Sequence, residues 1–192
     1  MESSNELNNS VSIIAHDAGG AELLSSYVIH NKNVNFIFAL SGPAVKVFRR
    51  KLGGITICSI NEAVSNSNTM LCGTGWGSKF ELNGIATARS MKKKSVAFLD
   101  HWVSYKERFL LNGDIVLPDE IWVSDKYAQK YAYDIFPDIH IRLIKNYFFE
   151  DIKKEYKKIT VNKENQIDEL NVLFVSDNIN AVSYTHLTLP TN

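Results

Sequence analysis

Residues 71–109 read LCGTGWGSKFELNGIATARSMKKKSVAFLDHWVSYKERF. In this stretch an apolar strand candidate runs into a glycine-rich turn, then a helix, and then a second apolar strand that ends at Asp100, His101 and Trp102. Ligands bind at the carboxyl ends of the strands in an open parallel sheet. The stretch therefore predicts a parallel sheet and places a site at the edge where its strands end.

The rest of the chain repeats this alternation of short apolar runs and amphipathic stretches. Strands are predicted at Val11–Ala15, Asn35–Leu40, Ile55–Cys58, Thr69–Cys72, Ser95–Leu99, Glu120–Val123 and His140–Leu143. Helices are predicted at Gly20–His30, Pro43–Lys51, Lys79–Met91, Asp125–Ile135 and Phe149–Lys157. This order indicates a doubly wound, Rossmann-like α/β domain with a mostly parallel sheet of six or seven strands and helices on both faces.

The domain is expected to occupy residues 11–158, after a disordered N-terminus at 1–10. Residues 159–170 are polar and irregular, which is typical of a linker. Residues 171–180 contain a new apolar strand, interpreted as the start of a truncated second domain. Residues 181–192 resemble translated adaptor sequence, and we exclude this non-native tail from the fold.

Charge and composition narrow the class of protein. The 21 Lys and Arg residues balance 21 Asp and Glu residues, so no general basic excess points to a nucleic-acid partner. The basic clusters at 91–94 and 153–158 are interpreted as solvated helix faces, with attraction to a polyanion or a membrane surface as the alternative. Neither a signal peptide nor an apolar run of about 18 residues is present, and Cys58 and Cys72 are interpreted as buried reduced thiols, so we expect a cytoplasmic protein.

The first candidate for chemistry is the loop from His16 to Gly20, between the first strand and the first helix. Gly19 and Gly20 would let the backbone approach a ligand, and the helix start would favour an anion or a hydroxyl-rich ligand. The structural alternative is a tight turn in which His16 or Asp17 caps the helix. Both interpretations stay open.

The second candidate is the glycine-rich turn itself, formed by Gly73, Thr74, Gly75, Trp76, Gly77 and Ser78. Its glycines superficially suggest a dinucleotide fingerprint, with Asp100 as the ribose-binding acid. The fingerprint needs two residues between its second and third glycines and normally follows the first strand, and neither condition holds. Nicotinamide or flavin binding is therefore the less favoured interpretation.

The carboxylate and imidazole of Asp100 and His101 are candidates for general acid or base work, although neighbours on a strand point to opposite faces. The structural alternative is that His101 stacks under Trp102. Glu107 and Arg108 are expected to form an exposed ion pair.

The third candidate lies at two later strand ends, where Ser124 and Asn146 could touch a ligand. Aromatic residues are frequent in both segments, which more often indicates packing. Ser124 and Asn146 are therefore ligand-binding candidates beside a structural alternative.

The layout of residues 11–150 resembles the N-terminal domain of the two-domain glycosyltransferase B fold. The similar group contains lipid A disaccharide synthase, the muramyl-lipid N-acetylglucosaminyltransferase and UDP-N-acetylglucosamine 2-epimerase. The loop from His16 to Gly20 looks like that group's acceptor-side loop, and residues 119–123, 136–137 and 146–148 look like its run into the interdomain connection. The epimerases' Arg-Pro-Glu loop and the muramyl enzyme's longer Gly-Gly-His loop are not in the sequence.

The resemblance implies a cleft between two domains, with a small-molecule or glycan acceptor held by this half and a nucleotide-sugar donor held mainly by the other. We expect the N-terminal part of a metal-independent glycosyltransferase or nucleotide-sugar epimerase of surface polysaccharide synthesis, without a cofactor and inactive as a fragment. The candidate bases are His16, Asp17 and Asp100, with His101 as a further catalytic candidate. The alternative is a non-catalytic domain that binds a nucleotide or a sugar phosphate.

Overall fold

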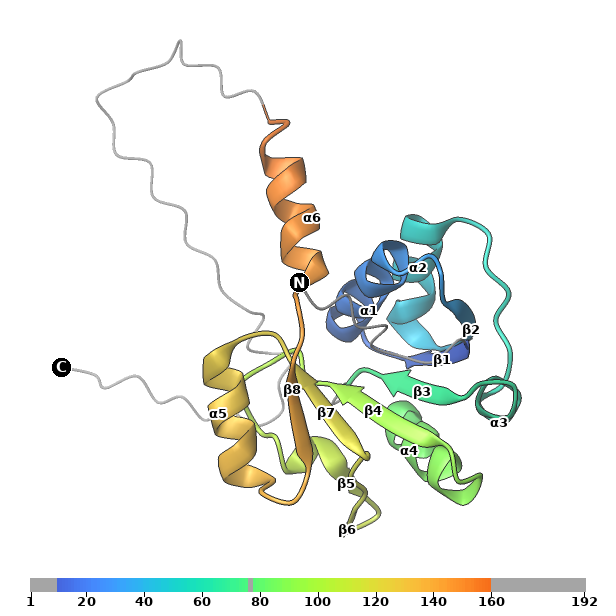
Figure 1. The fold of residues 1–192 in the computed structure, drawn as a ribbon. Helices are drawn as coiled ribbons and strands as arrows, with labels where there is room; N and C mark the ends of the chain where they lie inside the picture. Colours follow the sequence, from blue (N-terminus) through green and yellow to red (C-terminus); the bar gives the residue numbers. More distant parts are fainter. Residues whose placement is uncertain (1–9, 76–77, 160–192) are drawn as a thin grey trace, which may run out of the picture. The chain divides into compact units, whose positions relative to one another are not determined.

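A single parallel sheet organises the chain, in the strand order β2-β1-β3-β4-β7-β8 (Figure 1). The computed structural model describes residues 10–75 and 78–159. Its strands are β1 (Ser10–Ala15), β2 (Asn35–Leu40), β3 (Thr69–Cys72), β4 (Lys94–Phe98), β7 (Glu120–Val123) and β8 (His140–Leu143), with a separate antiparallel hairpin of β5 (Leu110–Leu111) and β6 (Asp114–Ile115). The helices are α1 (Ala18–His30), α2 (Gly42–Leu52), α3 (Ile60–Ser65), α4 (Phe80–Ser90), α5 (Lys126–Ile135) and α6 (Tyr147–Tyr156), with a 3-10 turn at Glu107–Phe109.

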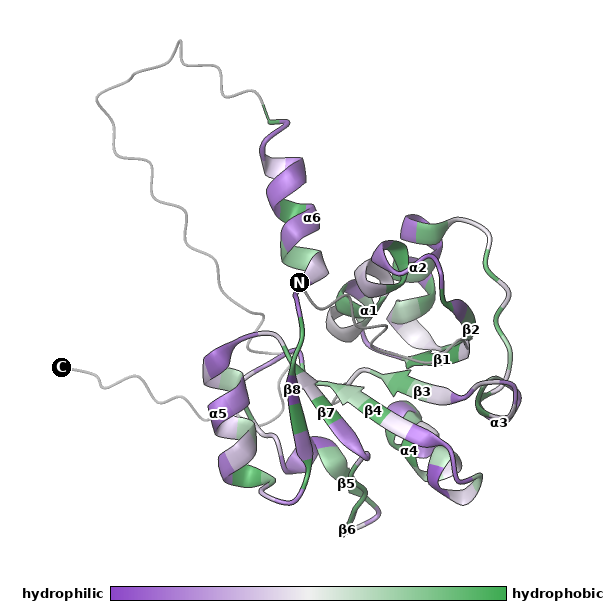
Figure 2. Ribbon diagram, viewed as in Figure 1, coloured by the Kyte–Doolittle hydropathy of each residue, from purple (hydrophilic) through white to green (hydrophobic). Residues whose placement is uncertain are grey.

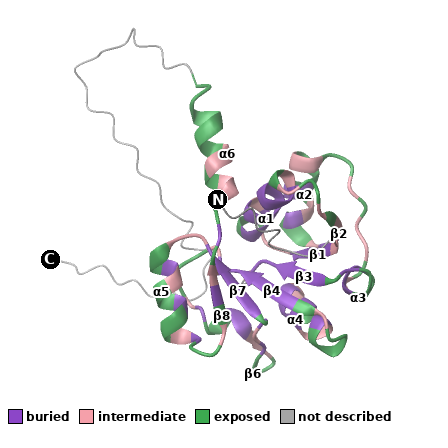
Figure 3. Cartoon of the chain, in the orientation of Figure 1, coloured by how far each residue is buried: buried purple, intermediate pink, exposed green. Residues whose placement is uncertain are grey.

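The helices cover both faces of the sheet because the strand side chains alternate between two apolar cores. Along β1, Ile13 belongs to the core that contains residues of α1 and α2, whereas Ile14 belongs to the core that contains residues of α3, α4 and α5. Strands β1, β3, β4 and β7 are largely buried (Figure 3), and each contains residues coloured hydrophobic in Figure 2. The predicted doubly wound, Rossmann-like α/β class is confirmed.

The strand order indicates one place where a ligand site is expected. Strand β1 pairs with β2 on one side and with β3 on the other, so the chain reverses its direction of winding between β1 and β3. In doubly wound sheets the loops that leave the strands at such a reversal diverge and open a crevice. Here those loops are residues 16–17 after β1 and the glycine-rich turn after β3.

Local details differ from the prediction in three places. Residues 55–58 are not a full strand and form only an isolated bridge, between Ile57 and Phe38, because α3 begins soon afterwards, capped by the Ser59 side chain. The segment after β4 contains elements that were not predicted, the 3-10 turn and the β5-β6 hairpin. Strand β1 also begins at Ser10, inside the stretch predicted to be disordered.

The chain divides into two units, residues 1–158 and 159–192, and the sheet belongs to the first. The predicted N-terminal segment at 1–9 and the predicted linker, second-domain strand and tail beyond Ile159 lie outside the described residues. Of the cysteines, Cys72 is buried and Cys58 is only partly buried, and both are free thiols.

Among the described residues, Trp122 is the largest fully buried side chain, and it belongs to the core between the sheet and α1. Its indole N–H donates to Glu120 at 2.7 Å, and its ring packs against Tyr27 with a centroid distance of 5.3 Å. We expect Trp122→Phe to lower the free energy of unfolding by about 2–4 kcal/mol, since it opens a void and leaves a buried carboxylate short of a donor. Urea unfolding monitored by far-UV circular dichroism measures this change.

Trp102→Phe is the matched control, because Trp102 is 63% exposed. We expect its cost to stay within about 1 kcal/mol. Equal losses for the two variants would contradict the assignment of Trp122 to the core.

Candidate functional site

A cavity of about 360 Å³ lies at the carboxyl ends of the strands. It is formed where β4, β7 and β8 end and where α1 begins. Six of the residues singled out in the sequence line it: Gly19, Asp100, His101, Trp102, Ser124 and Asn146. The topology therefore brings together candidates that lie far apart in the sequence, as expected for the ligand-binding edge of such a sheet.

Beside the cavity, Asp17 lies in a cradle made of glycines from two loops. Its side chain accepts a hydrogen bond from the Gly20 N–H at 3.1 Å and so caps α1. A Cβ added to Gly20 would lie 3.0 Å from Asp17 Oδ1, and a Cβ added to Gly75 would lie 3.1 Å from the same oxygen. A Cβ added to Gly73 would lie 3.4 Å from the Cα of Gly20. The glycines of both candidate loops are thus needed for close packing around one carboxylate.

Asp100 faces the same cradle from the end of β4. An added Cβ at Gly19 would lie 2.8 Å from Asp100 Oδ2 and 3.6 Å from Asp17 Oδ2, so both carboxylates approach this glycine. Burial raises the pKa of Asp100 above its ordinary value, the negative charge of Asp17 raises it further, and the positive charge of Arg108 partly opposes both effects.

Arg108 corrects the expectation of an exposed Glu107–Arg108 ion pair. Its side chain is 5% exposed, and its guanidinium lies 3.1 Å from Asp100 Oδ1. The same guanidinium donates to the Thr74 carbonyl and, at 3.3 Å, to the Thr74 hydroxyl, while Nε donates to the Val103 carbonyl at 3.1 Å. The 3-10 turn directs Arg108 inward, where the carboxylate and the loop carbonyls satisfy its charge.

Glu81 is a buried carboxylate that the sequence analysis missed. It is 3% exposed, and its Oε1 accepts the His16 backbone N–H at 2.7 Å, which ties the first turn of α4 to the loop after β1. Its spacing to Ile85 and Ala88 places it on the apolar face of α4, and that position was the available signal. Among the described residues, neither Glu81 Oε2 nor Asp17 Oδ1 has a hydrogen-bond partner, although both atoms are buried.

Other predicted site residues have mainly structural contacts. The His16 ring faces the β2-α2 turn, since an added Cβ at Gly42, where φ is 51°, would lie 2.6 Å from His16 Nε2. Ser78 accepts the Phe80 N–H at 3.0 Å at the start of α4. His101 is exposed, and its Nδ1 accepts the Trp102 N–H at 3.2 Å. Trp76 and Gly77 lie outside the described residues.

The far wall of the cavity consists of helix caps and aromatic rings. Asp125 caps α5 by accepting the N–H groups of Tyr127 and Ala128 at 2.9 Å, and it also accepts the Trp102 indole N–H at 2.9 Å. Asn146 caps α6 by accepting the Phe149 N–H at 3.0 Å. Asp125 and Phe149, which were not predicted to bind a ligand, also line the cavity.

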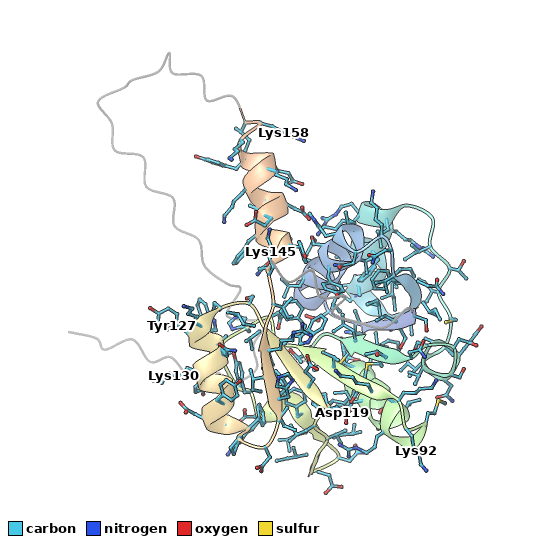
Figure 4. The ribbon with its side chains drawn as sticks, viewed as in Figure 1. Lys92, Asp119, Tyr127, Lys130, Lys145 and Lys158 are labelled. Atoms are coloured by element: carbon cyan, nitrogen blue, oxygen red, sulfur yellow. The ribbon has the colours of Figure 1, made fainter. Side chains whose placement is uncertain are left out.

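The basic clusters lie away from this site. Lys92 and Lys158, labelled in Figure 4, are exposed, in agreement with solvated surfaces. Across residues 10–75 and 78–159, no helix has the length and apolar character to cross a bilayer. Within the same ranges, no group of three or more His, Cys, Asp or Glu side chains is arranged to hold a metal ion.

Comparison of the chain with protein-family models, with curated proteins and with solved structures gives no match. The function is therefore argued from the site itself. Asp100 lines the cavity and is paired with the buried Arg108, Asp17 lies next to it against the same glycine, and Glu81 accepts the backbone N–H of the neighbouring His16. Such a site favours a ligand that donates hydrogen bonds, and it can accept a proton from one.

Glu81→Gln tests whether the buried negative charge of Glu81, close to Asp17, destabilises the fold. Burial raises the pKa of Glu81, and the charge of Asp17 adds to this, whereas its backbone hydrogen bonds oppose it. Glu81 therefore contributes stability when it is a neutral carboxyl group, which is fully the case below the pKa that it has in the unfolded state. This contribution is lost as the pH rises through the pKa that it has in the folded state. Because the amide oxygen of the variant can still accept the His16 N–H, we expect the variant to be more stable than the wild type at about pH 8, with the difference shrinking toward about pH 4.

Thermal unfolding across this pH range measures the effect. Glu155→Gln, an exposed change on α6, serves as the control and should leave the pH dependence as it is. A Glu81→Gln protein that is less stable than the wild type at about pH 8 would contradict the assignment of strain to this carboxylate.

Proposed function

We propose that this domain is the acceptor-side half of a glycosyltransferase-like or nucleotide-sugar-epimerase-like enzyme of surface polysaccharide synthesis. The observation that carries the proposal is the approach of Asp17 and Asp100 to one glycine at the rim of the cavity. In the transferase form, Asp100 accepts the proton of an acceptor hydroxyl while that oxygen attacks the anomeric carbon of a nucleotide-sugar. The bond from that carbon to the nucleoside diphosphate breaks, and the diphosphate leaves with the electron pair.

The surroundings of Asp100 suit a general base. An ordinary aspartate binds protons too weakly at neutral pH to remove one from a hydroxyl efficiently, so a raised pKa improves the driving force. Burial and Asp17 raise the pKa of Asp100, while Arg108 fixes one of its oxygens and directs the carboxylate toward Gly19. Positioned proton transfer of this kind contributes about 10²- to 10⁴-fold in rate.

The alternative of a nucleotide- or sugar-phosphate-binding domain is less well supported by the site. A phosphate in the loop after β1 would use the free N–H groups at the start of α1. The carboxylate of Asp17 already accepts the Gly20 N–H there, and Glu81 and Asp100 add further negative charge nearby. This arrangement opposes an anion at that position and favours a hydroxyl-bearing ligand.

Nucleotide-sugar turnover by the protein expressed from its complete open reading frame tests the proposal. We expect Asp100→Asn to lower kcat by about 10²-fold or more, because the proton acceptor is lost. Asp17→Asn keeps a helix-capping side chain and should lower kcat less, since it removes only the charge that supports Asp100. His101→Ala tests a further candidate for proton transfer.

Asp134→Asn, on the exposed side of α5, is the matched control and should leave turnover unchanged. Full turnover in the Asp17, Asp100 and His101 variants together would rule out this assignment.

A further inference from the structure

The cavity presents negative charge to a ligand. Asp100 and Asp125 both line it, and among its described lining residues there is no lysine or arginine. The paired cation, Arg108, is buried behind Asp100 and donates to the carbonyls of Thr74 and Val103. A bound cation would therefore gain from two carboxylates, whereas a bound anion would meet them without a compensating basic side chain.

Aromatic rings lie beside these carboxylates. The indole of Trp102 is 63% exposed, and its hydrogen bond to Asp125 fixes the ring next to that carboxylate. Phe149, which is 57% exposed, also lines the cavity, at the start of α6. An exposed tryptophan face attracts both the C–H face of a sugar ring and a nearby ammonium group.

We propose that this cavity binds a sugar ring that carries a protonated amine. The inference rests on the proposed function, in which the ligand is a hydroxyl-bearing acceptor, and it adds the charge of that acceptor. The ring stacks on Trp102, the ammonium group lies between the indole and the carboxylates of Asp125 and Asp100, and the hydroxyls donate to the remaining acceptor atoms. A cavity of about 360 Å³ is at the small end of the range for ligand sites, which fits a ligand of this size.

The charge of the inner cradle supports the same choice. Asp17 Oδ1 and Glu81 Oε2 are buried, lack a partner among the described residues and lie outside the cavity lining, so they act on a ligand through their negative charge alone. A positively charged ligand beside Asp100 offsets part of this negative charge. A phosphorylated sugar would increase it.

Isothermal titration of the full 192-residue chain with four related sugars tests the inference. Glucosamine, glucose, N-acetylglucosamine and glucose 6-phosphate share one ring and differ in charge. We expect glucosamine to bind about 10-fold more tightly than glucose or N-acetylglucosamine, and glucose 6-phosphate to bind most weakly. The advantage of glucosamine should shrink in high salt, because the attraction is electrostatic.

Two variants test which residues cause the expected preference for glucosamine over glucose. Asp125→Asn keeps the helix cap and removes one charge, so we expect it to weaken glucosamine binding about 5- to 10-fold and to leave glucose binding nearly unchanged. Trp102→Ala should weaken both sugars, because both stack on the ring. Asp134→Asn, the control from the same helix, should change neither.

Equal affinity for glucosamine and glucose, tighter binding of glucose 6-phosphate, or no binding of any of the four sugars would overturn the inference. These outcomes are separate from a failure of the proposed function. The titration measures binding by the present chain, whereas the proposed function is tested by the loss of turnover in Asp100→Asn.

Discussion

The site depends on one buried guanidinium. Arg108 joins the Thr74 loop after β3 to Asp100 after β4, so a single side chain fixes the two loops that follow neighbouring strands. Burying this cation is tolerable because a carboxylate and backbone carbonyls compensate it. Without it, Asp100 would be a buried carboxylate near Asp17 that has lost the largest of the contributions that lower its pKa.

The same edge of the sheet carries three helix caps, Asp17, Asp125 and Asn146. Each follows a strand and accepts an N–H group from the first turn of the next helix, so parallel topology gathers these polar side chains at one edge. Their carboxylate and amide groups are consequently positioned by helix geometry as well as by loop packing. Asp125 and Asn146 line the cavity in this way, whereas His101 and Trp102 belong to the connection between β4 and β7.

Much of the architecture could be predicted from the sequence. Strands β2, β3, β7 and β8 are short runs of apolar and β-branched residues bounded by turn residues, and their predicted ends agree with the structure. Gly73, Gly75 and Asp100 could be placed at strand ends, because a parallel sheet puts all such ends on one edge. The distances between these residues could not be predicted, since they depend on which strands are neighbours.

The buried polar side chains were harder to predict than the strands. Arg108 lies in a charged, amphipathic segment, where an exposed ion pair is the ordinary outcome, and its burial depends on partners in other segments. The spacing of Glu81 to Ile85 and Ala88 indicates the apolar face of its helix, but its partner, the His16 N–H, is not contained in the local pattern.

The proposed site requires Asp17 and Asp100 to be electrostatically coupled. NMR titration of the Asp100 carboxyl carbon, in the wild type and in Asp17→Asn, measures this coupling. We expect a pKa above the ordinary aspartate value in the wild type and a lower pKa in the variant, because the neighbouring negative charge is gone. An Asp100 that titrates at the ordinary value in both proteins would contradict it.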